Sequence, residues 1–394
     1  MLLHGIFPPI TTPFYPDGRV YLKKLEHNVE RYSKTPVAGI VALGSTGEAI
    51  MLSDEERREV LKTVRQACAP HKVLIAGTGA ESAIETLRLT EYAADLGYDV
   101  ALVRTPHFYR PQMQPANLLA FYRTVADRSS IPILIYSVPV FTNYDMPAEL
   151  VIELADHPNI IGIKESGGHI EKIRRIAEAT RHIKRSATVT ETFAAVTPRM
   201  LEAANHESTN GNGELVPITA LAGETSRAHV GAALQARPAE QSSAINKAEY
   251  QTQVEHHPSP RSGGSSSSSS SAMGTLKTRR KEIGFQILAG QAQKLHPSLD
   301  AGAVGAVLAF ADPAPTACYE IYAAWKEGDA ALGRLKQDRI STAAAKVAGQ
   351  FGIPALKYAM DLNGYYGGPP RLPLLPLTAD AKSEVERLMA DIRN

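Results

Sequence analysis

The sequence predicts a (β/α)8 barrel followed by a C-terminal helical domain. Short apolar runs of strand type alternate with amphipathic stretches of helical period along most of the chain, which is the pattern of repeated βα units. Eight strand-like runs precede residue 313, and residues 313–394 then show helical patterns interrupted by one segment rich in glycine and proline. Eight strands with intervening helices favour a closed barrel, and a doubly wound sheet is the second choice.

The expected strands are short and mostly apolar. They cover residues 5–14, 39–46, 72–79, 99–106, 132–139, 160–166, 285–291 and 303–312. Helices are expected between them, and the helix over residues 53–69 has the clearest start signal. Ser53 stands at its N-cap position and Glu56 follows three residues later, so the two can form a capping box.

One region departs from this alternation. Residues 186–282 lose the apolar periodicity and contain a run of serines at 265–271 and the basic stretch "KTRRK" at 277–281. Such a composition cannot bury enough apolar surface to offset the entropy of ordering, so it predicts a disordered insert. The barrel is then expected to consist of residues 1–185 and 283–312. The insert is interpreted either as a tolerated insertion, including a gene-model error such as an unspliced intron, or as a regulatory segment.

The position of the insert predicts which face of the barrel it leaves. It lies between the sixth helix and the seventh strand, and therefore at the N-terminal ends of the strands. Barrel chemistry occurs at the opposite, C-terminal ends. We therefore expect the insert to lie away from any active site.

Composition excludes several classes of protein. The chain has 394 residues, 44% of them hydrophobic, and a formal net charge of +1, which gives no basic excess for nucleic acid. Cys68 and Cys318 match no metal spacing or disulfide framework. No apolar run reaches the roughly 18 residues of a membrane span, and the first strand begins at residue 5, so no signal or transit peptide is expected. These features predict a cytoplasmic location, with a mitochondrial one as the weaker alternative.

Lys164 ends the apolar strand "NIIGIKES". Burying an ammonium group costs several kcal/mol unless an acid pairs with it or it loses its proton. At the C-terminal end of a barrel strand, desolvation would supply a neutral amine that can attack a ketone. The alternatives are pairing with an acid such as Glu165, or a lysine that extends its charged end to solvent.

Tyr136 ends the preceding strand in "ILIYSVP". Neighbouring barrel strands would bring its phenol and the Lys164 amine to the same rim. Forming an imine requires a proton relay to remove water from the carbinolamine, and a phenol can both donate and accept that proton. The alternative is an ordinary core tyrosine with its hydroxyl at the surface.

The second strand ends in "GSTGEA", residues 44–49. Gly44 allows a tight turn with exposed backbone N–H groups, and Ser45 and Thr46 add hydroxyl donors, which together suit a small carboxylate such as that of an α-keto acid. The stretch lacks the Gly-Lys-Ser/Thr pattern of a phosphate loop. Glu48 is interpreted as a structural hydrogen-bond acceptor under the turn.

The motifs "GSTGE", "TPHFYRP", "YSVP" and "GIKES" occur in this order, and together they resemble the dihydrodipicolinate synthase and N-acetylneuraminate lyase superfamily of pyruvate-dependent, Schiff-base aldolases. Within it, "KESGG", "FQILAGQ" and the long stretch "FGIPALKYAMDLNGYYGGPPRLPL" look most like 4-hydroxy-2-oxoglutarate aldolase. The resemblance covers nearly the whole chain outside the insert. It implies a carbon–carbon lyase acting on pyruvate and an aldehyde, a homotetramer, and no cofactor or metal.

The resemblance also implies roles for single residues. Lys164 becomes the imine lysine and Tyr136 the proton-relay tyrosine. Ser45 and Thr46 become the pyruvate-carboxylate and relay positions, with Thr46 catalytic. Residues expected to bind substrate are Gly44, Ser45, Thr46, Gly290 and Val307.

Departures from the superfamily leave the aldehyde open. The dihydrodipicolinate synthases have an arginine for the carboxylate of aspartate semialdehyde where this chain has Phe141, and a relay tyrosine where it has Phe108, next to Tyr109. A phenyl ring cannot replace a bidentate guanidinium contact. The alternatives are therefore a 3-deoxy-hexulosonate aldolase, a dihydrodipicolinate synthase, and an inactive barrel with a binding or structural role. A metal-dependent aldolase is set aside because His4, His107 and His169 share no ligand spacing.

Overall fold

Eight parallel strands form the centre of the structure, a computed structural model that describes residues 1–209 and 276–392. They are β1 (Gly5–Phe7), β2 (Gly39–Ala42), β3 (Val73–Gly77), β4 (Val100–Arg104), β5 (Ile133–Ser137), β6 (Ile160–Glu165), β9 (Gln286–Ala289) and β10 (Gly305–Val307). Their order in the sheet is β1-β10-β9-β6-β5-β4-β3-β2. The N–H groups of Ala38 and Val41 donate to the carbonyls of Ile6 and Pro8, at 2.9 and 3.0 Å, so β1 and β2 meet and the sheet closes.

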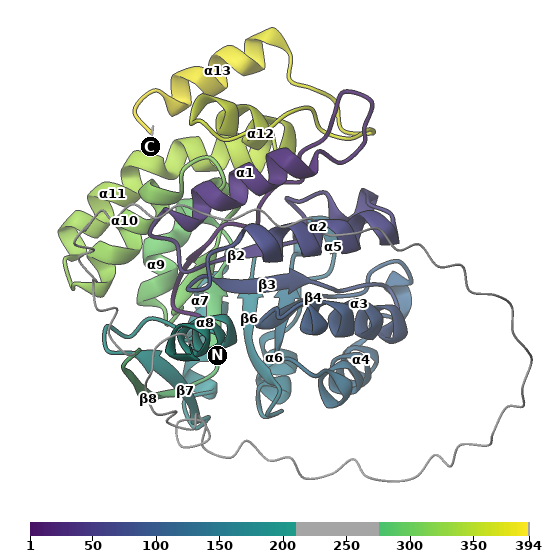
Figure 1. Cartoon of the computed structure of the whole chain (residues 1–394), viewed down its shortest axis with the longest axis vertical. Helices are drawn as coiled ribbons and strands as arrows, with labels where there is room; N and C mark the ends of the chain where they lie inside the picture. The colour runs from purple at the N-terminus through teal and green to yellow at the C-terminus, as the bar shows by residue number, and fades with distance from the viewer. Residues whose placement is uncertain (210–275, 393–394) are drawn as a thin grey trace, which may run out of the picture. The chain divides into compact units, whose positions relative to one another are not determined.

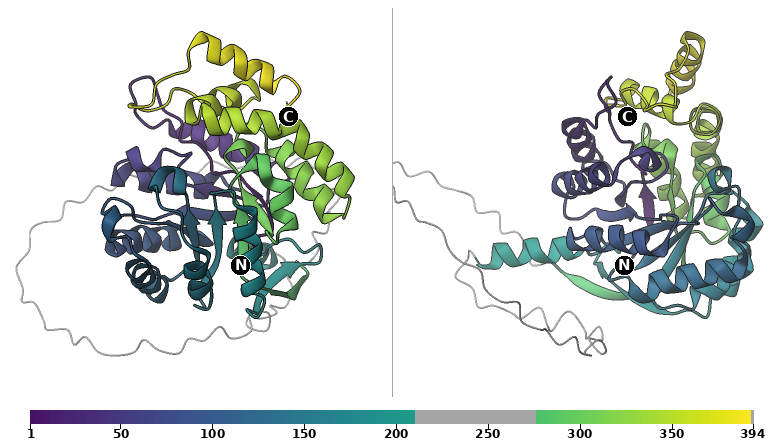
Figure 2. Two further views of the ribbon diagram at one scale, coloured as in Figure 1. Left: turned by 180° about the vertical axis from the view of Figure 1, so that it is seen from behind. Right: turned by 90° about the vertical axis from the view of Figure 1, so that its right-hand side faces the viewer.

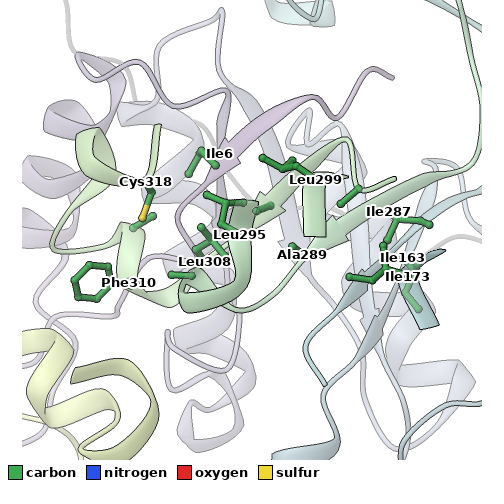
Figure 3. Close-up of a cluster of buried hydrophobic side chains, with 14 of the residues drawn as sticks. Ile6, Ile163, Ile173, Ile287, Ala289, Leu295, Leu299, Leu308, Phe310 and Cys318 are labelled. Carbon is green, nitrogen blue, oxygen red and sulfur yellow. The ribbon is translucent and has the colours of Figure 1, made fainter. Parts of the chain in front are cut away.

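Helices surround the strands (Figure 1). The outer layer consists of α1 (Leu22–Ser33), α2 (Asp54–Ala67), α3 (Ala83–Asp95), α4 (Pro115–Arg128), α6 (Ala148–Ala155), α7 (Ile170–Ala179), α9 (Leu295–Asp300) and α10 (Pro315–Lys326). Apolar side chains fill the space between strands and helices, as Figure 3 shows for Ile163, Ile173 and Ile287. The (β/α)8 barrel predicted from the sequence is confirmed.

Several strands are shorter than the sequence patterns suggested. The first strand ends at Phe7 and not near residue 14, because Pro8 and Pro9 have no N–H to donate to a sheet ladder. The last strand ends at Val307, and a 3-10 turn, Ala309–Ala311, leads from it to Asp312. The capping box of α2 is present as predicted, since the side chains of Ser53 and Glu56 each accept from the other residue's backbone N–H.

The pairing of β5 with β6 contains a bulge. Ile133 pairs with Ile160 but Leu134 pairs with Gly162, so β6 carries one extra residue at Ile161. Because side chains alternate between the two faces of a strand, one extra residue reverses the faces of all residues that follow. The bulge brings Lys164 into register with Tyr136.

The C-terminal region is helical, as expected. It contains α11 (Ala330–Ala343), a π-helical stretch (Ala344–Gln350), α12 (Ile353–Leu362) and α13 (Ala379–Met389). Met360 of α12 packs in one cluster with Leu25 and Val29 of α1, and α12 lies beside α1 in the views of Figures 1 and 2. None of the helices in the described residues is long and apolar enough to cross a membrane.

The disordered insert predicted over residues 186–282 is wrong at both ends, which contain regular secondary structure. Residues 186–209 and 276–282 include β7 (Arg185–Thr190), which pairs antiparallel with β8 (Thr278–Ile283), and α8 (Pro198–Thr209). The prediction failed there because Ala187, Val189 and Ile283 pack on Leu2 in a small apolar cluster, which the polar composition of the region concealed. Residues 210–275 lie outside the described part of the chain.

The ordered edges of the insert cover the N-terminal end of the barrel. The buried side chain of Arg199 donates to the carbonyl of Gly97 at 2.7 Å and to the carboxylate of Asp99 at 3.0 Å, and it also contacts the carbonyl of Lys72. These partners precede β4 and β3. The placement agrees with the expected exit of the insert at the face opposite the strand ends that carry Lys164 and Tyr136.

Candidate active site

Lys164 lies near the end of β6, in register with Tyr136 of β5 on one side and Leu288 of β9 on the other. Its residue surface is 4% exposed, and Nζ lies 4.1 Å from the centroid of the Tyr136 ring. No carboxylate among the described residues lies within ion-pair distance of Nζ. A buried primary amine therefore stands against a phenol at the rim of the barrel.

Glu165 does not neutralise Lys164. Alternation along the strand directs neighbouring side chains to opposite faces, and the carboxylate of Glu165 accepts from the N–H groups of Gly167 and Gly168, each at 2.9 Å. Lys172 lies 3.5 Å from the same carboxylate. Glu165 thus orders the turn that follows β6, and the pairing considered from the sequence is absent.

The hydroxyl of Tyr136 reaches the turn after β2. Its oxygen lies 3.3 Å from Ser45 Oγ, and either hydroxyl can donate. Thr46 is buried, but the described hydrogen bonds of Tyr136 include Ser45 and not Thr46. The geometry makes Ser45 the direct partner of the phenol, and the catalytic role expected for Thr46 stays a prediction.

A cavity of about 470 Å³ opens at the C-terminal ends of β2 to β5. Gly44, Ser45 and Tyr136 line one part of its wall, and we call this space the rim cavity. Residues of the C-terminal region, Ile353, Pro373 and Leu374, close another part.

Gly290 and Val307 do not line the rim cavity. Val307 is completely buried among the apolar side chains inside the barrel, in one cluster with Tyr136. A Cβ on Gly290 would come within 2.2 Å of Ser166 Oγ, so the absence of a side chain allows the two loops to approach. Substrate contact by either residue stays a prediction, and packing accounts for what the structure shows.

Glu48 is a structural acceptor, as interpreted from the sequence. It is buried, adopts a left-handed backbone conformation with φ of 55°, and lies 2.5 Å from the Nζ of Lys357 on α12. Its other oxygen accepts from the N–H of Arg371 at 2.9 Å. Burial lowers the pKa of Lys357, and the charge of Glu48 acts in the opposite direction. The turn that carries Ser45 is therefore held by the C-terminal region.

The sequence reasoning missed Asp312. It follows β10, is completely buried, and neither carboxyl oxygen has a hydrogen-bond partner among the described residues. Burial raises the pKa of Asp312 well above its usual range, and the charge of Lys164 acts in the opposite direction. The rule that strand ends carry chemistry could have found it, because it closes the eighth expected strand.

Arg104 was missed in the same way, although it ends β4. It lines the rim cavity and is in register with Tyr136. Nη1 lies 2.7 Å from Glu81 Oε1 and 2.9 Å from His107 Nδ1. The strand "DVALVRTP" ends in this cation just as "IIGIKES" ends in a lysine, which was the available signal.

The positions that depart from the superfamily differ in their surroundings. Phe141 lines the rim cavity and brings no charge to it. Phe108 and Tyr109 are 75% and 68% exposed, with ring centroids 5.2 Å apart, and neither lines the cavity. Replacement of the relay tyrosine by Tyr109 therefore stays a prediction. Within residues 1–209 and 276–392, no cluster of three or more His, Cys, Asp or Glu side chains could hold a metal ion.

Comparison with known proteins decides the family. Residues 2–196 and 267–392 match the model of the Dihydrodipicolinate synthetase family. The chain belongs to this family. The dihydrodipicolinate synthetase family model skips the residues between 196 and 267, which fall within the insert predicted from the sequence.

Curated relatives share about 40% of the residues aligned. The chain is 40% identical over 179 residues to the 4-hydroxy-tetrahydrodipicolinate synthase of Methanothrix thermoacetophila, covering 45% of this chain and 59% of that protein. It is 40% identical over 173 residues to the enzyme of the same name from Xanthomonas campestris pv. campestris, covering 44% and 57%. These alignments therefore span less than two thirds of the relatives' length.

Solved structures of the dihydrodipicolinate synthetase family share the fold. YagE, a prophage protein from E. coli K12 solved in complex with pyruvate, superimposes with a TM-score of 0.68 at 21% identity, covering 100% of this chain and 99% of that one. A putative family protein from Coccidioides immitis gives a TM-score of 0.65 at 21% identity, covering 99% and 95%. At these identities the comparison establishes the barrel architecture.

Proposed function

We propose that this family member is a class I, Schiff-base aldolase that cleaves a 4-hydroxy-2-keto acid, with 4-hydroxy-2-oxoglutarate as the first candidate, to pyruvate and an aldehyde. The observation that carries the proposal is the buried amine of Lys164, which has no ion-pair partner among the described residues and lies against the ring of Tyr136. A buried amine without an ion-pair partner, beside a proton donor, is equipped to form an imine.

The contact of the Lys164 amine with Tyr136, which lines the rim cavity although Lys164 does not, supports the following reaction sequence. Lys164 Nζ attacks the C2 carbonyl carbon of the substrate, and the hydroxyl of Tyr136 donates the proton with which water leaves the carbinolamine. In the protonated imine, the Tyr136 phenolate takes the proton of the C4 hydroxyl, the C3–C4 bond breaks, and the electron pair of that bond moves into the enamine. The aldehyde departs, C3 takes a proton, and water hydrolyses the imine to release pyruvate and the Lys164 amine.

The turn after β2 completes this assignment. Ser45 Oγ lies 3.3 Å from the hydroxyl of Tyr136, so it can return a proton to the phenol between steps. Gly44 and Ser45 line the rim cavity beside it, where backbone and hydroxyl donors can hold the substrate carboxylate. The homotetramer implied by the resemblance stays a prediction.

A second candidate is the activity named for the curated relatives, 4-hydroxy-tetrahydrodipicolinate synthase. It would use the same imine but join pyruvate to aspartate semialdehyde. Phe141 lines the rim cavity where those synthases carry an arginine, which weighs against a carboxylate contact at that position. A 3-deoxy-hexulosonate aldolase is a third candidate. The motif "GSTGEA" suits the carboxylate of a small keto acid and does not determine which aldehyde is released.

Borohydride trapping tests the proposal. Reduction in the presence of pyruvate should leave a stable secondary amine on the peptide that contains Lys164, and Lys164→Ala should abolish both the adduct and cleavage of 4-hydroxy-2-oxoglutarate. Tyr136→Phe should slow turnover by a factor on the order of 10² to 10⁴ while the fold is kept, the usual scale of general acid–base catalysis. Mass spectrometry locates the adduct, and pyruvate release measures turnover.

A nearby lysine provides the matched control. Lys172 is also largely buried and pairs with Asp145 at 2.5 Å, so Lys172→Ala should keep the adduct. An adduct on a lysine other than Lys164, or metal-free cleavage without any adduct, would refute the mechanism. Stronger activity with pyruvate and aspartate semialdehyde than with 4-hydroxy-2-oxoglutarate would transfer the assignment to the synthase.

A further inference from the structure

Arg104 lines the rim cavity and lies on β4, the strand beside the one that carries Tyr136. The arginines that line this cavity among the described residues are Arg57 of α2 and Arg104 of β4. Arg104 is in register with Tyr136, whose ring contacts Lys164. The strand that carries Arg104 is therefore one strand further from β6, which carries Lys164, than β5 is.

The side chain of Arg104 is held in position from two sides. Glu81 anchors Nη1 at 2.7 Å, and the other oxygen of Glu81 accepts from the N–H groups of His107 and Phe108 at 2.9 and 3.0 Å. A Cβ on Gly79 would come within 2.4 Å of the backbone nitrogen of Arg104 and within 2.9 Å of its Cγ, so only glycine allows this close approach. The arginine is thus fixed at the cavity wall.

Nη1 makes the side-chain hydrogen bonds of Arg104 to described residues, one to Glu81 and one to His107. Nε and Nη2 keep their N–H groups for another acceptor. A planar guanidinium fork of this kind matches the two oxygens of a carboxylate. Arg57 is less suitable, because its Nε donates to the carbonyl of Ala49 at 3.1 Å.

We infer that Arg104 binds the carboxylate at the far end of the substrate and so makes the enzyme selective for keto acids with a second, distal carboxylate. This inference rests on the proposed aldolase function for the identity of the reacting end. It assigns to a residue of β4 the distal contact that Phe141 cannot make from the segment after β5.

Calorimetric binding tests the inference without requiring turnover. The probes are 2-oxoglutarate and 2-oxopentanoate, five-carbon keto acids that differ in a distal carboxylate or methyl group. The unmodified protein should bind 2-oxoglutarate more tightly by about 10- to 100-fold, the scale of hydrogen bonds to a charged group. Arg104→Met should abolish the difference, and Arg104→Lys should keep only part of it because an ammonium lacks the planar fork.

Arg57→Met is the matched control, since it removes the other cavity-lining arginine and should keep the preference for 2-oxoglutarate. Equal binding of the two acids by the unmodified protein, or loss of preference in Arg57→Met but not in Arg104→Met, would overturn the inference. Pyruvate trapping separates it from the proposed function. If trapping fails while binding still depends on Arg104, the aldolase assignment falls and the carboxylate site stands.

Discussion

Asp312 is a buried acid close enough to Lys164 to feel its charge. Burial favours the protonated form of its carboxyl group and raises its pKa well above the usual range. A neutral acid at this place would not neutralise the Lys164 ammonium, and it would leave the amine without a counter-ion. The protonation state of Asp312 therefore bears on the chemistry proposed for the lysine.

Replacing Asp312 with asparagine should relieve a pH-dependent loss of stability. The unfolded chain releases the Asp312 proton near pH 4, whereas the folded protein retains it to higher pH. Above pH 4 the unfolded state therefore binds fewer protons and stability falls as pH rises. Asp312→Asn removes this loss, so its free energy of unfolding relative to the unmodified protein should be more favourable at pH 7 than at pH 4, as measured by urea unfolding.

The exposed Asp338 of α11 controls for the chemical change. Asp338→Asn should alter the free energy of unfolding by less than about 0.5 kcal/mol at either pH. An Asp312→Asn difference that stays constant between pH 4 and 7 would mean that the carboxyl group is ionised in the fold.

Sequence reasoning predicted that Lys164 and Tyr136 lie together, but it did not predict the residues around them. Lys164 and Tyr136 could be predicted because each ends an apolar strand, and parallel strand ends meet at one rim. Arg104 also ends a strand, and Asp312 ends the eighth run expected from the sequence, but the imine mechanism does not require either residue. Their importance depends on burial and on which donors stay unused, which appear only when the barrel is closed.

At the scale of elements, the C-terminal region holds two parts of the barrel, which are helix α2 and the turn that follows β2. Glu48 in this turn pairs with Lys357 of α12, and Glu56 in the first turn of α2 receives two hydrogen bonds from the Arg371 guanidinium, at 2.6 and 2.8 Å. Lys357 also donates to the carbonyls of Thr12 and Pro369. The C-terminal helices are thus part of the active-site support.

Removing one partner of the Glu48–Lys357 pair should be costly. Lys357→Met or Glu48→Gln should each lower the free energy of unfolding by about 3–5 kcal/mol, because the other charge stays buried without its partner. The free energy of unfolding of the double variant should fall by less than the sum of the two single losses, since neither charge remains buried without a partner. Urea unfolding of the four proteins measures this coupling.

Lys346→Met offers a control at a partly exposed pair. Lys346 bonds Glu384, and the two side chains are 39% and 30% exposed, so the loss of this pair should cost less than the loss of the buried pair, about 1 kcal/mol. Strictly additive losses for Glu48→Gln and Lys357→Met would show that the two side chains act independently.

The elements themselves were largely predictable, and their exact ends were not. Eight apolar runs located the eight strands, whereas the Pro8–Pro9 pair shortened the first of them. The bulge at Ile161 has no signal in a run of isoleucines, because every register of "NIIGI" places an apolar side chain on each face. Pairing with β5 selects one of these registers. The register therefore depends on both strands and cannot be predicted from the sequence of β6 alone.

At the scale of the whole molecule, the edges of the insert act as a cap on the N-terminal end of the barrel. Helix α8 of this cap lies between the two ranges that the family model matches, whereas β7 and β8 lie within them. Burial raises the pKa of Asp99, and the nearby charge of Arg199 acts in the opposite direction. The cap and the rim cavity lie at opposite ends of the strands.

Deleting residues 186–282 should therefore separate stability from activity. In β7 and β8, Arg185 pairs with Ile283, so an Asn-Gly turn between them can close the chain. We expect cleavage activity within about twofold of the unmodified protein, because the site is remote. The free energy of unfolding should fall by a few kcal/mol, because the cap packs on Leu2 and Asp99.

Arg199→Met in the full chain tests whether the contact with Asp99 causes the loss of stability. It leaves Asp99 buried without its cation and should cost about 3–5 kcal/mol, again with cleavage activity preserved. If the deletion abolishes activity while the protein stays folded, the insert has a part in catalysis.

The bulge in β6 has a thermodynamic consequence for the proposed reaction. The bulge brings Lys164 into register with Tyr136. The backbone spacing of two paired strands therefore sets the distance between the residues that carry the amine and the phenol. The entropy of bringing the two groups together is then lost once, when the chain folds, and not at each turnover. The temperature dependence of imine formation should accordingly reflect bond making and breaking, with little activation entropy arising from these two side chains.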